Sequence, residues 1–268
     1  MSPLTLSEIW IYPIKSFAGI RVKQAKLKQK GLEGDRRWML MDETGRFITQ
    51  REHPNLALFD LSIDNAGLLV VNRITQQKLV VDNHSTLTGT EYAATIWDDE
   101  VKVVEPDMKY SNWFSKQVGI ACKLVFFPET NVRNVDPKYA SNQEQVSLAD
   151  GYPYLIIGQS SLNDLNSRLE VPVTMQRFRP NFVFTGGEAF EEDGWQHFKI
   201  GANLFRGVKR CARCVLTTVN PQTGEKGSEP LLTLSKYRKE ENKIFFGQNV
   251  IALSLENLIS EGDEITME

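Results

Sequence analysis

The chain has 268 residues, a formal net charge of -3 and three cysteines. This length allows one large domain or two modest ones, with a core that needs no disulfide. The slightly acidic balance excludes a protein that coats nucleic acid with a general basic field, so any anion-binding site must be local. The low, odd number of cysteines excludes a disulfide framework and favours reduced thiols.

The sequence predicts neither secretion nor membrane insertion. Its N-terminal residues lack a basic region followed by a long apolar region, so no secretory signal is expected. No run approaches the roughly eighteen uninterrupted apolar residues that a membrane-spanning helix needs. We therefore expect a cytoplasmic protein.

Strand-forming residues dominate the N-terminal part of the chain. Aromatic and β-branched side chains predict a strand over residues 6–12, which Pro13 ends. Alternating polarity predicts another strand over residues 20–27, and residues 38–50 predict a hairpin. Short β-like runs then recur about every ten residues from 58 to 105, a spacing typical of an antiparallel sheet or barrel.

The predicted helices are few and short. Residues 111–118 predict one, with Ser111 as its N-cap and Gly119 just past its end. Regularly spaced leucines predict a second, amphipathic helix over residues 160–169. Residues 131–145 are polar and lack periodicity, which predicts a loop near a domain boundary.

The C-terminal part again favours strands, over residues 182–184 and 245–255, with a short helix at 231–237. Just before the first of these strands, one residue separates Arg177 from Arg179. On an extended backbone two such side chains point the same way, so they could clamp one anion. A pair of surface salt bridges is the alternative.

The stretch with the most chemistry is residues 206–224, where Cys211 and Cys214 lie among four basic residues. Such cations stabilise a thiolate, which is a soft metal ligand, and they can also hold an anion beside the sulfur. Residues 215–219 are apolar or β-branched and predict a strand. We therefore expect Cys214 at the entrance of a strand.

Several readings of the cysteine pair find little support. A structural zinc site needs further ligands, and only Cys122 and three scattered histidines remain. Attached haem needs a histidine at the position that Val215 occupies. A thioredoxin-like dithiol belongs at the start of a helix, whereas a strand is predicted here. A thiolate among basic residues suits instead a phosphorylated cofactor whose metal needs a soft ligand.

Five short motifs follow one another along nearly the whole chain. They are Tyr12-Pro13-Ile14-Lys15-Ser16, Gly34-Asp35-Arg36, Phe178-Arg179-Pro180-Asn181, Arg213-Cys214-Val215-Leu216-Thr217-Thr218-Val219 and Phe246-Gly247-Gln248. Taken in this order, they resemble the MOSC-domain molybdenum proteins. The resemblance is greatest to the mitochondrial amidoxime-reducing component and to bacterial proteins that reduce N-hydroxylated bases.

The resemblance implies an α+β, mainly β fold with a few short helices. An N-terminal β-rich, barrel-like domain over residues 1–125 would precede a MOSC β-barrel over residues 126–268, with a molybdenum-molybdopterin cofactor between them. Cys214 would be the catalytic residue and the protein ligand to molybdenum. The positions that match the family's remaining cofactor-binding residues are Lys15, Ser16, Arg36, Asp150, Arg179, Asn181 and Arg213.

The same resemblance implies a reductase of N-hydroxylated bases, amidoximes and hydroxylamines, which would serve detoxification. Electrons would come from a separate ferredoxin-like, flavin-reductase or cytochrome b5-like partner. The alternative is a sulfur- or cofactor-carrier protein in which Cys214 bears a persulfide or holds the cofactor. A third possibility is a non-enzymatic anion-binding module with a structural dithiol.

Overall fold

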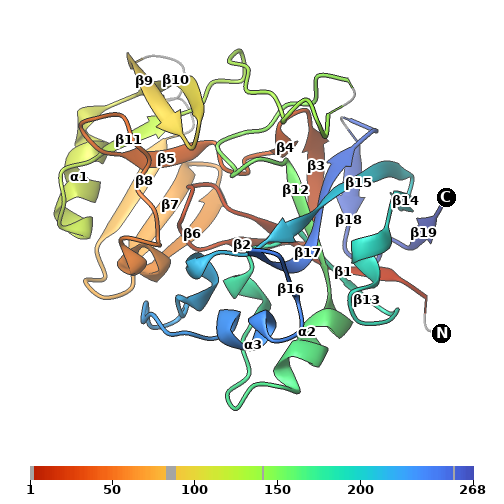
Figure 1. Ribbon diagram of the computed structural model, residues 1–268. Helices are drawn as coiled ribbons and strands as arrows, with labels where there is room; N and C mark the ends of the chain where they lie inside the picture. Colours follow the sequence, from red (N-terminus) through yellow and green to blue (C-terminus); the bar gives the residue numbers. More distant parts are fainter. Residues whose placement is uncertain (1–2, 83–88, 141, 256) are drawn as a thin grey trace.

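The computed structural model describes residues 3–82, 89–140, 142–255 and 257–268. Within these residues the chain forms four β-sheets and three α-helices (Figure 1). The mainly β, α+β class predicted from the sequence is therefore confirmed.

The largest sheet has nine strands and draws on both halves of the sequence. Its strands follow the order β19, β14, β15, β17, β12, β13, β1 and β2, with β16 paired to β17. Neighbouring strands are antiparallel except for the parallel pair β12 and β13. The strands are β1 (Thr5–Ile11), β2 (Ile20–Val22), β12 (Tyr154–Gly158), β13 (Phe182–Thr185), β14 (His197–Ile200), β15 (Asn203–Ala212), β16 (Lys239–Glu240), β17 (Lys243–Ala252) and β19 (Ile265–Met267).

This sheet curls until residues 4–6 meet residues 262–265 through three backbone hydrogen bonds. An isolated bridge joins Thr5 to Glu264, and the Leu6 N–H donates to the Asp263 carbonyl at 2.9 Å. In the part of the chain that the structure describes, the strand order stays open, so the barrels implied for the two domains are curled sheets and not closed ones. The curl encloses a core of buried apolar side chains that includes Leu6, Ile9, Phe182, Phe198 and Phe205.

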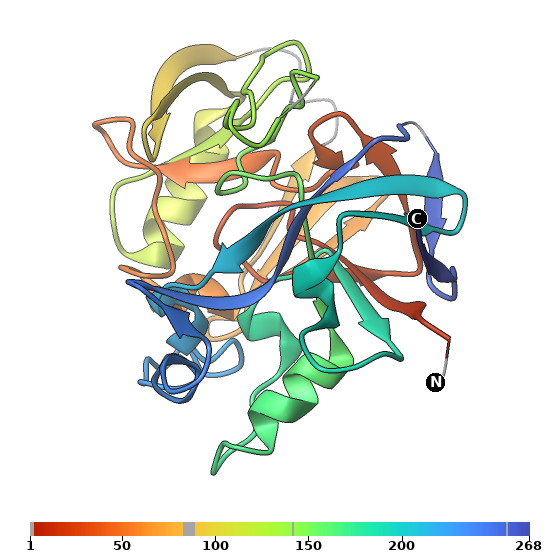
Figure 2. The same ribbon diagram turned by 45° about the vertical axis from the view of Figure 1, so that its right-hand side comes forward.

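Strands from the two ends of the sequence complete one another. β1 pairs with β13, and β3 (Gln24–Lys28) pairs with both β4 (Gly31–Leu32) and β18 (Leu258–Ser260). The strands between residues 5 and 32 therefore lie in sheets shared with the C-terminal half, as Figure 2 also shows. The division between residues 125 and 126 stays a prediction.

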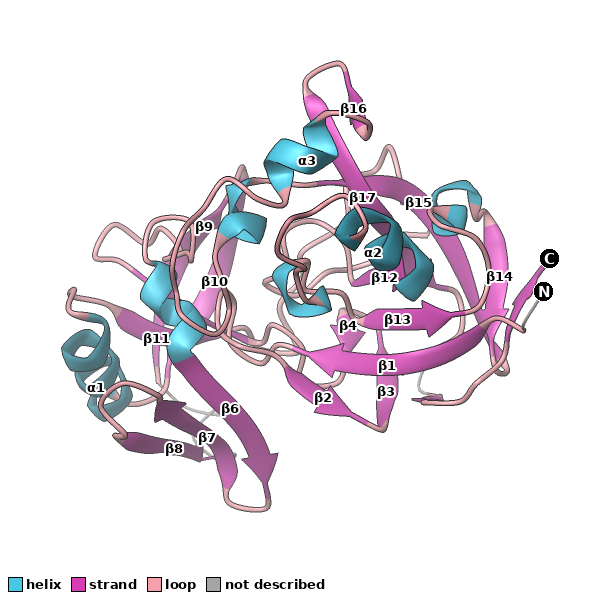
Figure 3. Ribbon diagram, turned by 90° about the horizontal axis from the view of Figure 1, so that it is seen from below, coloured by secondary structure: helices cyan, strands magenta, loops and turns pink. Residues whose placement is uncertain are grey.

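The rest of the N-terminal half forms a separate lobe (Figure 3). One of its sheets follows the order β5, β11, β10, β9, and the other the order β6, β7, β8. The helix of this lobe, α1 (Met108–Val118), packs against β11 and β8, and Cys122 is buried nearby. The strands are β5 (Trp38–Met41), β6 (Phe59–Asp64), β7 (Gly67–Asn72), β8 (Lys78–Asp82), β9 (Thr90–Ile96), β10 (Asp99–Glu105) and β11 (Lys123–Phe126).

The helices are short, as predicted, but each differs from its predicted bounds at one end or both. α1 begins three residues early, at Met108, because Asp107 and not Ser111 is its N-cap and accepts from the Lys109 N–H at 2.8 Å. Gly119 ends it in the left-handed conformation. The helices are α1 (Met108–Val118), α2 (Gln159–Asn166), α3 (Leu231–Ser235) and the 3-10 turns η1 (Pro54–Leu58), η3 (Met175–Arg177), η4 (Glu191–Gly194) and η5 (Val215–Thr218).

The strand predicted over residues 215–219 is wrong, because that segment is the 3-10 turn η5. Its threonines form local side-chain bonds: Thr217 Oγ1 donates to the Cys214 carbonyl at 3.0 Å and Thr218 Oγ1 to the Val215 carbonyl at 2.8 Å. Such bonds offer the backbone an alternative to strand pairing. Cys214 therefore lies at the start of a tight turn, not of a strand.

Gly247 marks a point in β17 where the backbone needs glycine. Its φ is +83°, and a Cβ there would lie 2.6 Å from Cγ1 of Ile157 and 3.0 Å from the carbonyl oxygen of Ile156. A left-handed residue with a side chain is strained, and the neighbouring strand β12 leaves it no room.

We expect Gly247→Ala to lower the free energy of unfolding by about 3 kcal/mol, from the sum of backbone strain and overpacking. Urea denaturation followed by circular dichroism measures it. Gly194→Ala is the matched control, because no atom lies within 4 Å of a Cβ built at Gly194. Equal effects of the two substitutions would contradict the packing argument.

Candidate functional site

One cleft gathers the chemistry of this chain. It encloses about 820 Å³, counted out to its open mouth, between the segments that follow β1, β5 and β15. Of the residues that the structure describes, five cationic side chains but a single carboxylate line it. These charged residues are Lys15, Arg36, Arg51, Arg179, Arg213 and Asp150.

The structure brings all the sequence-predicted site residues to this cleft. They come from positions that span two hundred residues of sequence, and only the fold makes them neighbours. Their binding roles stay a prediction, but their convergence is a structural fact. The residues are Lys15, Ser16, Arg36, Asp150, Arg179, Asn181, Arg213 and Cys214.

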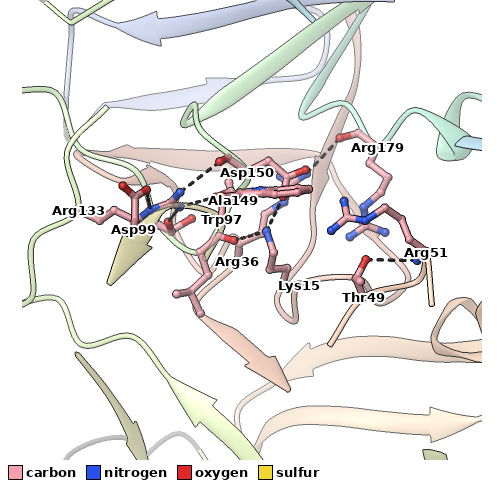
Figure 4. A network of polar contacts seen from close by, with 12 residues as sticks. Lys15, Arg36, Thr49, Arg51, Trp97, Asp99, Arg133, Ala149, Asp150 and Arg179 are labelled. Atoms are coloured by element: carbon pink, nitrogen blue, oxygen red, sulfur yellow. Dashed lines mark hydrogen bonds and ion pairs between the residues drawn. The ribbon is translucent and has the colours of Figure 1, made fainter. Parts of the chain in front are cut away.

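Lys15 is held at the base of the cleft by fixed acceptors (Figure 4). Its Nζ donates to the Leu148 carbonyl at 2.8 Å and to Asp150 Oδ1 at 2.6 Å. Burial lowers the pKa of Lys15 to about 8, although Asp150 opposes that shift. Lost hydration alone would raise the pKa of the Asp150 carboxyl, but Lys15 outweighs it and holds that pKa below its usual range.

Arg133 fixes the loop that carries Asp150. Its guanidinium donates to the carbonyls of Ser147 at 2.9 Å and Asp150 at 3.2 Å, and its Nε donates to Asp99 at 2.7 Å. One buried side chain therefore ties the loop 147–150 to the hairpin of β9 and β10. This anchor keeps the carboxylate of Asp150 within reach of Lys15.

The Asp35 carboxylate joins the two halves of the site. It is fully buried and accepts from the Tyr12 N–H at 2.7 Å, from Arg36 at 2.6 Å and from Asn181 Nδ2 at 3.2 Å. Asn181 in turn accepts from Arg36 at 3.1 Å. Arg36 and Asn181, which lie far apart in the sequence, thus share one network of charge-assisted bonds.

The Tyr12 ring lies between two arginines of the cleft. The guanidinium carbons of Arg36 and Arg179 lie 4.2 and 4.3 Å from its centroid. Two cations on one aromatic ring gain cation–π attraction, which offsets part of their mutual repulsion. Removal from water, reinforced by Arg36, lowers the pKa of Arg179 to about 10.

The predicted clamp of Arg177 and Arg179 is wrong. Arg177 lies in the 3-10 turn η3 and donates to the carbonyls of Thr217 and Thr218 at 3.3 and 3.0 Å. Arg179 has a φ of 56° and turns instead toward the Phe17 carbonyl, to which it donates at 2.5 Å. The backbone is not extended here, so the two side chains diverge.

Arg213 and the two cysteines form the other wall. Arg213 donates to the Phe178 carbonyl at 2.6 Å and to Cys211 Sγ at 2.9 Å, so its guanidinium is fixed from two sides. Cys211 is half-buried, whereas Cys214 is exposed and has an extended backbone. The accessible sulfur is therefore that of Cys214, whereas the sulfur of Cys211 helps to position Arg213.

Comparison with known proteins shows which family this chain resembles. The model of the MOSC N-terminal beta barrel domain matches residues 3–121, and that of the MOSC domain matches residues 143–266. The chain is 35% identical to mitochondrial amidoxime reducing component 2 of Homo sapiens, over 87% of this chain and 72% of that protein. The chain belongs to the MOSC family.

Two further relatives differ in how much of them this MOSC chain covers. It is 32% identical to mitochondrial amidoxime-reducing component 1 of Homo sapiens, over 97% of this chain and 82% of that protein. It is 31% identical to the molybdenum cofactor sulfurase of Oryza sativa subsp. japonica, over 100% of this chain. The chain spans only about a third of that sulfurase, 34% of its length.

Reasoning from the sequence missed several residues of the MOSC cleft. Phe47, Thr49 and Arg51 line it from the segment after β5, and Trp97 reaches Asp150 with its Nε1 at 3.3 Å. A hairpin was predicted over residues 38–50, but nothing in its pattern distinguished a cleft wall from a solvated turn. Asp35 was noticed only as part of a motif.

The described ranges contain no group of three or more His, Cys, Asp and Glu side chains placed to hold a metal ion. The helices in the same residues are too short or too polar to span a membrane.

We expect Asp35→Asn to lower the free energy of unfolding by about 3 kcal/mol, because a buried Arg36 loses its counter-charge. Thermal and urea denaturation measure the change. Asp60→Asn is the control, since its pair with Arg73 at 3.2 Å involves a carboxylate that is 58% exposed and is worth about 0–1 kcal/mol. A loss at Asp35 no larger than at Asp60 would contradict the role of the network.

Proposed function

We propose that this MOSC protein is a molybdenum-cofactor-dependent reductase of N-hydroxylated compounds such as amidoximes, hydroxylamines and N-hydroxylated bases. The observation that carries the proposal is the union, in one cleft, of an exposed thiol at Cys214 with five cationic side chains. A soft sulfur ligand beside a field of positive charge matches a metal held by an anionic organic cofactor.

The residues of the cleft fit such a group. Four of the five cations are fixed on protein acceptors, which pre-organises them for an anion such as the phosphate of molybdopterin. The exposed Cys214 can reach a metal at the rim without any other protein ligand. The residues that would hold the cofactor are Lys15, Ser16, Arg36, Asp150, Arg179, Asn181, Arg213 and Cys214.

The bound cofactor would supply two-electron redox chemistry, and the chain supplies orientation and charge. Arg213 holds its guanidinium beside Cys211 and Phe178, within the wall that also carries Cys214. Lys15, with a pKa near 8, remains largely protonated at neutral pH, so its Nζ holds a proton and a positive charge inside the cleft. Asp150 keeps that ammonium in place.

The reductase also needs electrons from outside the chain. We propose a separate redox partner of ferredoxin-like, flavin-reductase or cytochrome b5-like type. Val215, next to Cys214, is 57% exposed, so the rim of the cleft is open to a partner. We also propose that this reaction removes toxic N-hydroxylated compounds in the cytoplasm.

A second candidate function is that of a sulfur or cofactor carrier. It is favoured by the match of the whole chain to part of a protein named molybdenum cofactor sulfurase, and by the exposure of Cys214. The two functions differ in what the purified protein holds. Stoichiometric molybdenum and pterin after expression in a cofactor-producing host support the reductase, whereas a Cys214 persulfide without metal supports the carrier.

We expect Cys214→Ala to lose at least 100-fold of its amidoxime reduction and most of its molybdenum, because the metal loses its protein ligand. Cys211→Ala should retain most of both, since the Phe178 carbonyl still fixes Arg213 at 2.6 Å. Benzamidoxime turnover with a chemical or enzymatic electron donor and metal analysis give the readouts. Equal losses in both variants would indicate a working dithiol instead.

We expect Arg179→Ala to lose cofactor more than stability. The substitution removes a cation from the Tyr12 ring and from the cleft, but its protein hydrogen bond goes to a single carbonyl, that of Phe17. Molybdenum content and the melting temperature of the same preparation separate the two effects. Arg168→Ala, two residues past the end of α2, is the control, because Arg168 is 48% exposed and pairs with Asp164 at 2.9 Å. Full molybdenum occupancy in Arg179→Ala would refute its role as an anchor.

A further inference from the structure

Within the described ranges, Arg51 differs from the other cations of the cleft because its guanidinium lacks a hydrogen-bonded protein acceptor. Lys15, Arg36, Arg179 and Arg213 each donate to named oxygen or sulfur atoms of the chain. Among the described residues, no hydrogen bond or ion pair engages the Arg51 guanidinium. In Figure 4 the dashed line between Thr49 and Arg51 belongs to the Arg51 backbone N–H, which donates to Thr49 Oγ1 at 3.2 Å.

Arg51 is nevertheless fixed in place. The backbone is held by a turn in which the N–H groups of Glu52 and His53 donate to the Thr49 carbonyl at 3.0 and 2.9 Å. The guanidinium lies over the Trp97 ring at 4.4 Å and near the Phe47 ring at 5.6 Å. A guanidinium that stacks through its face keeps the N–H donors of its edge available, and their fork matches a carboxylate or phosphate.

The ring under Arg51 is itself anchored to the site. Trp97 donates from Nε1 to Asp150 at 3.3 Å, and Asp150 pairs with Lys15 at 2.6 Å. Trp97 is 49% exposed, while Lys15 is 6% exposed. Arg51 therefore stands at the rim, where a substrate enters, and Lys15 stands at the base, where a resident cofactor would lie.

We infer that Arg51 is a specificity-determining residue that binds an anionic group, a carboxylate or phosphate, on the N-hydroxylated substrate. Phe47 and Trp97 offer it an aromatic wall for the planar body of the same molecule. This inference rests on the proposed function, because it presumes that the N-hydroxyl group of the substrate reaches the Cys214 side of the cleft.

Acidic side chains lie in a neighbouring groove, which Trp97 lines and which shares Asp150 with the cleft. They include Asp98, Asp99 and Glu100. A substrate held by that groove would carry positive charge, whereas a substrate held by Arg51 would carry negative charge. Arg51 lines the cleft that contains Cys214, whereas none of these three carboxylates does.

The test compares two substrates that differ by one carboxylate, benzamidoxime and 4-carboxybenzamidoxime, on the molybdenum-loaded protein. We expect Arg51→Gln to raise KM for the carboxylated compound about 10- to 100-fold and to change KM for the neutral one less than about 2-fold, since a charge-assisted pair is lost only in the first case. Arg51→Lys, which keeps the charge but not the fork, should fall between them.

Arg46→Gln is the matched control, because Arg46 is 64% exposed and pairs at the surface with Glu52 at 3.1 Å. Melting temperature and molybdenum content confirm that each variant is folded and loaded. Equal loss with both substrates, or loss of molybdenum in Arg51→Gln, would overturn the inference and assign Arg51 to the cofactor or the fold.

Calorimetric binding of the amidine product, 4-carboxybenzamidine, keeps the inference separate from the proposed function. If the wild-type protein reduces neither amidoxime, the reductase proposal fails, and binding of the amidine still decides the role of Arg51. Binding that weakens at least 10-fold in Arg51→Gln, with no change in Arg46→Gln, supports the inference. No binding by the wild-type protein, or unchanged binding in Arg51→Gln, overturns it.

Discussion

The arrangement of the cleft depends on one buried carboxylate, that of Asp35. It accepts hydrogen bonds from Tyr12, Arg36 and Asn181, and so ties the end of β1, the loop before β5 and the start of β13 to a single point. A buried charge is tolerated only when its partners are correctly placed. Displacing any one of these segments would therefore disturb all three of them. The positions of the cleft cations depend on the same network.

Sequence reasoning recovered the β-rich class, the short helices and the eight residues that meet in the cleft, but the eight came through resemblance to a family and not through periodicity. It failed where local chemistry overrides pattern. Thr217 and Thr218 have strand propensity, yet their hydroxyls bond to nearby carbonyls and wind the segment into a turn. Arg179 adopts a left-handed conformation that no alternation of residues foretells.

The sequence did not predict a role for Arg51 or Trp97, and the reason is different. Each is an ordinary surface residue in its own stretch of sequence, and their importance comes from a stacking contact between a loop and a hairpin tip some forty-six residues apart. The cations at the base of the cleft and the cation at its rim thus have different roles. Cations at its base are bound to the protein and hold their positions, while the rim retains a guanidinium that can still form bonds with something new.

The interlocking of the two ends of the sequence has a consequence for how the protein is made. β1 can pair with β13 only after β13 has been synthesised. Thr5 can form its bridge only after Glu264 has left the ribosome. Contacts of such long separation close late and slow folding. The lobe of β6, β7, β8 and α1 can collapse early, but the cleft needs Lys15 together with Cys214 and Asn249, and so is complete only after contacts of long sequence separation have closed. An anion would therefore meet the full set of cleft cations only late in folding.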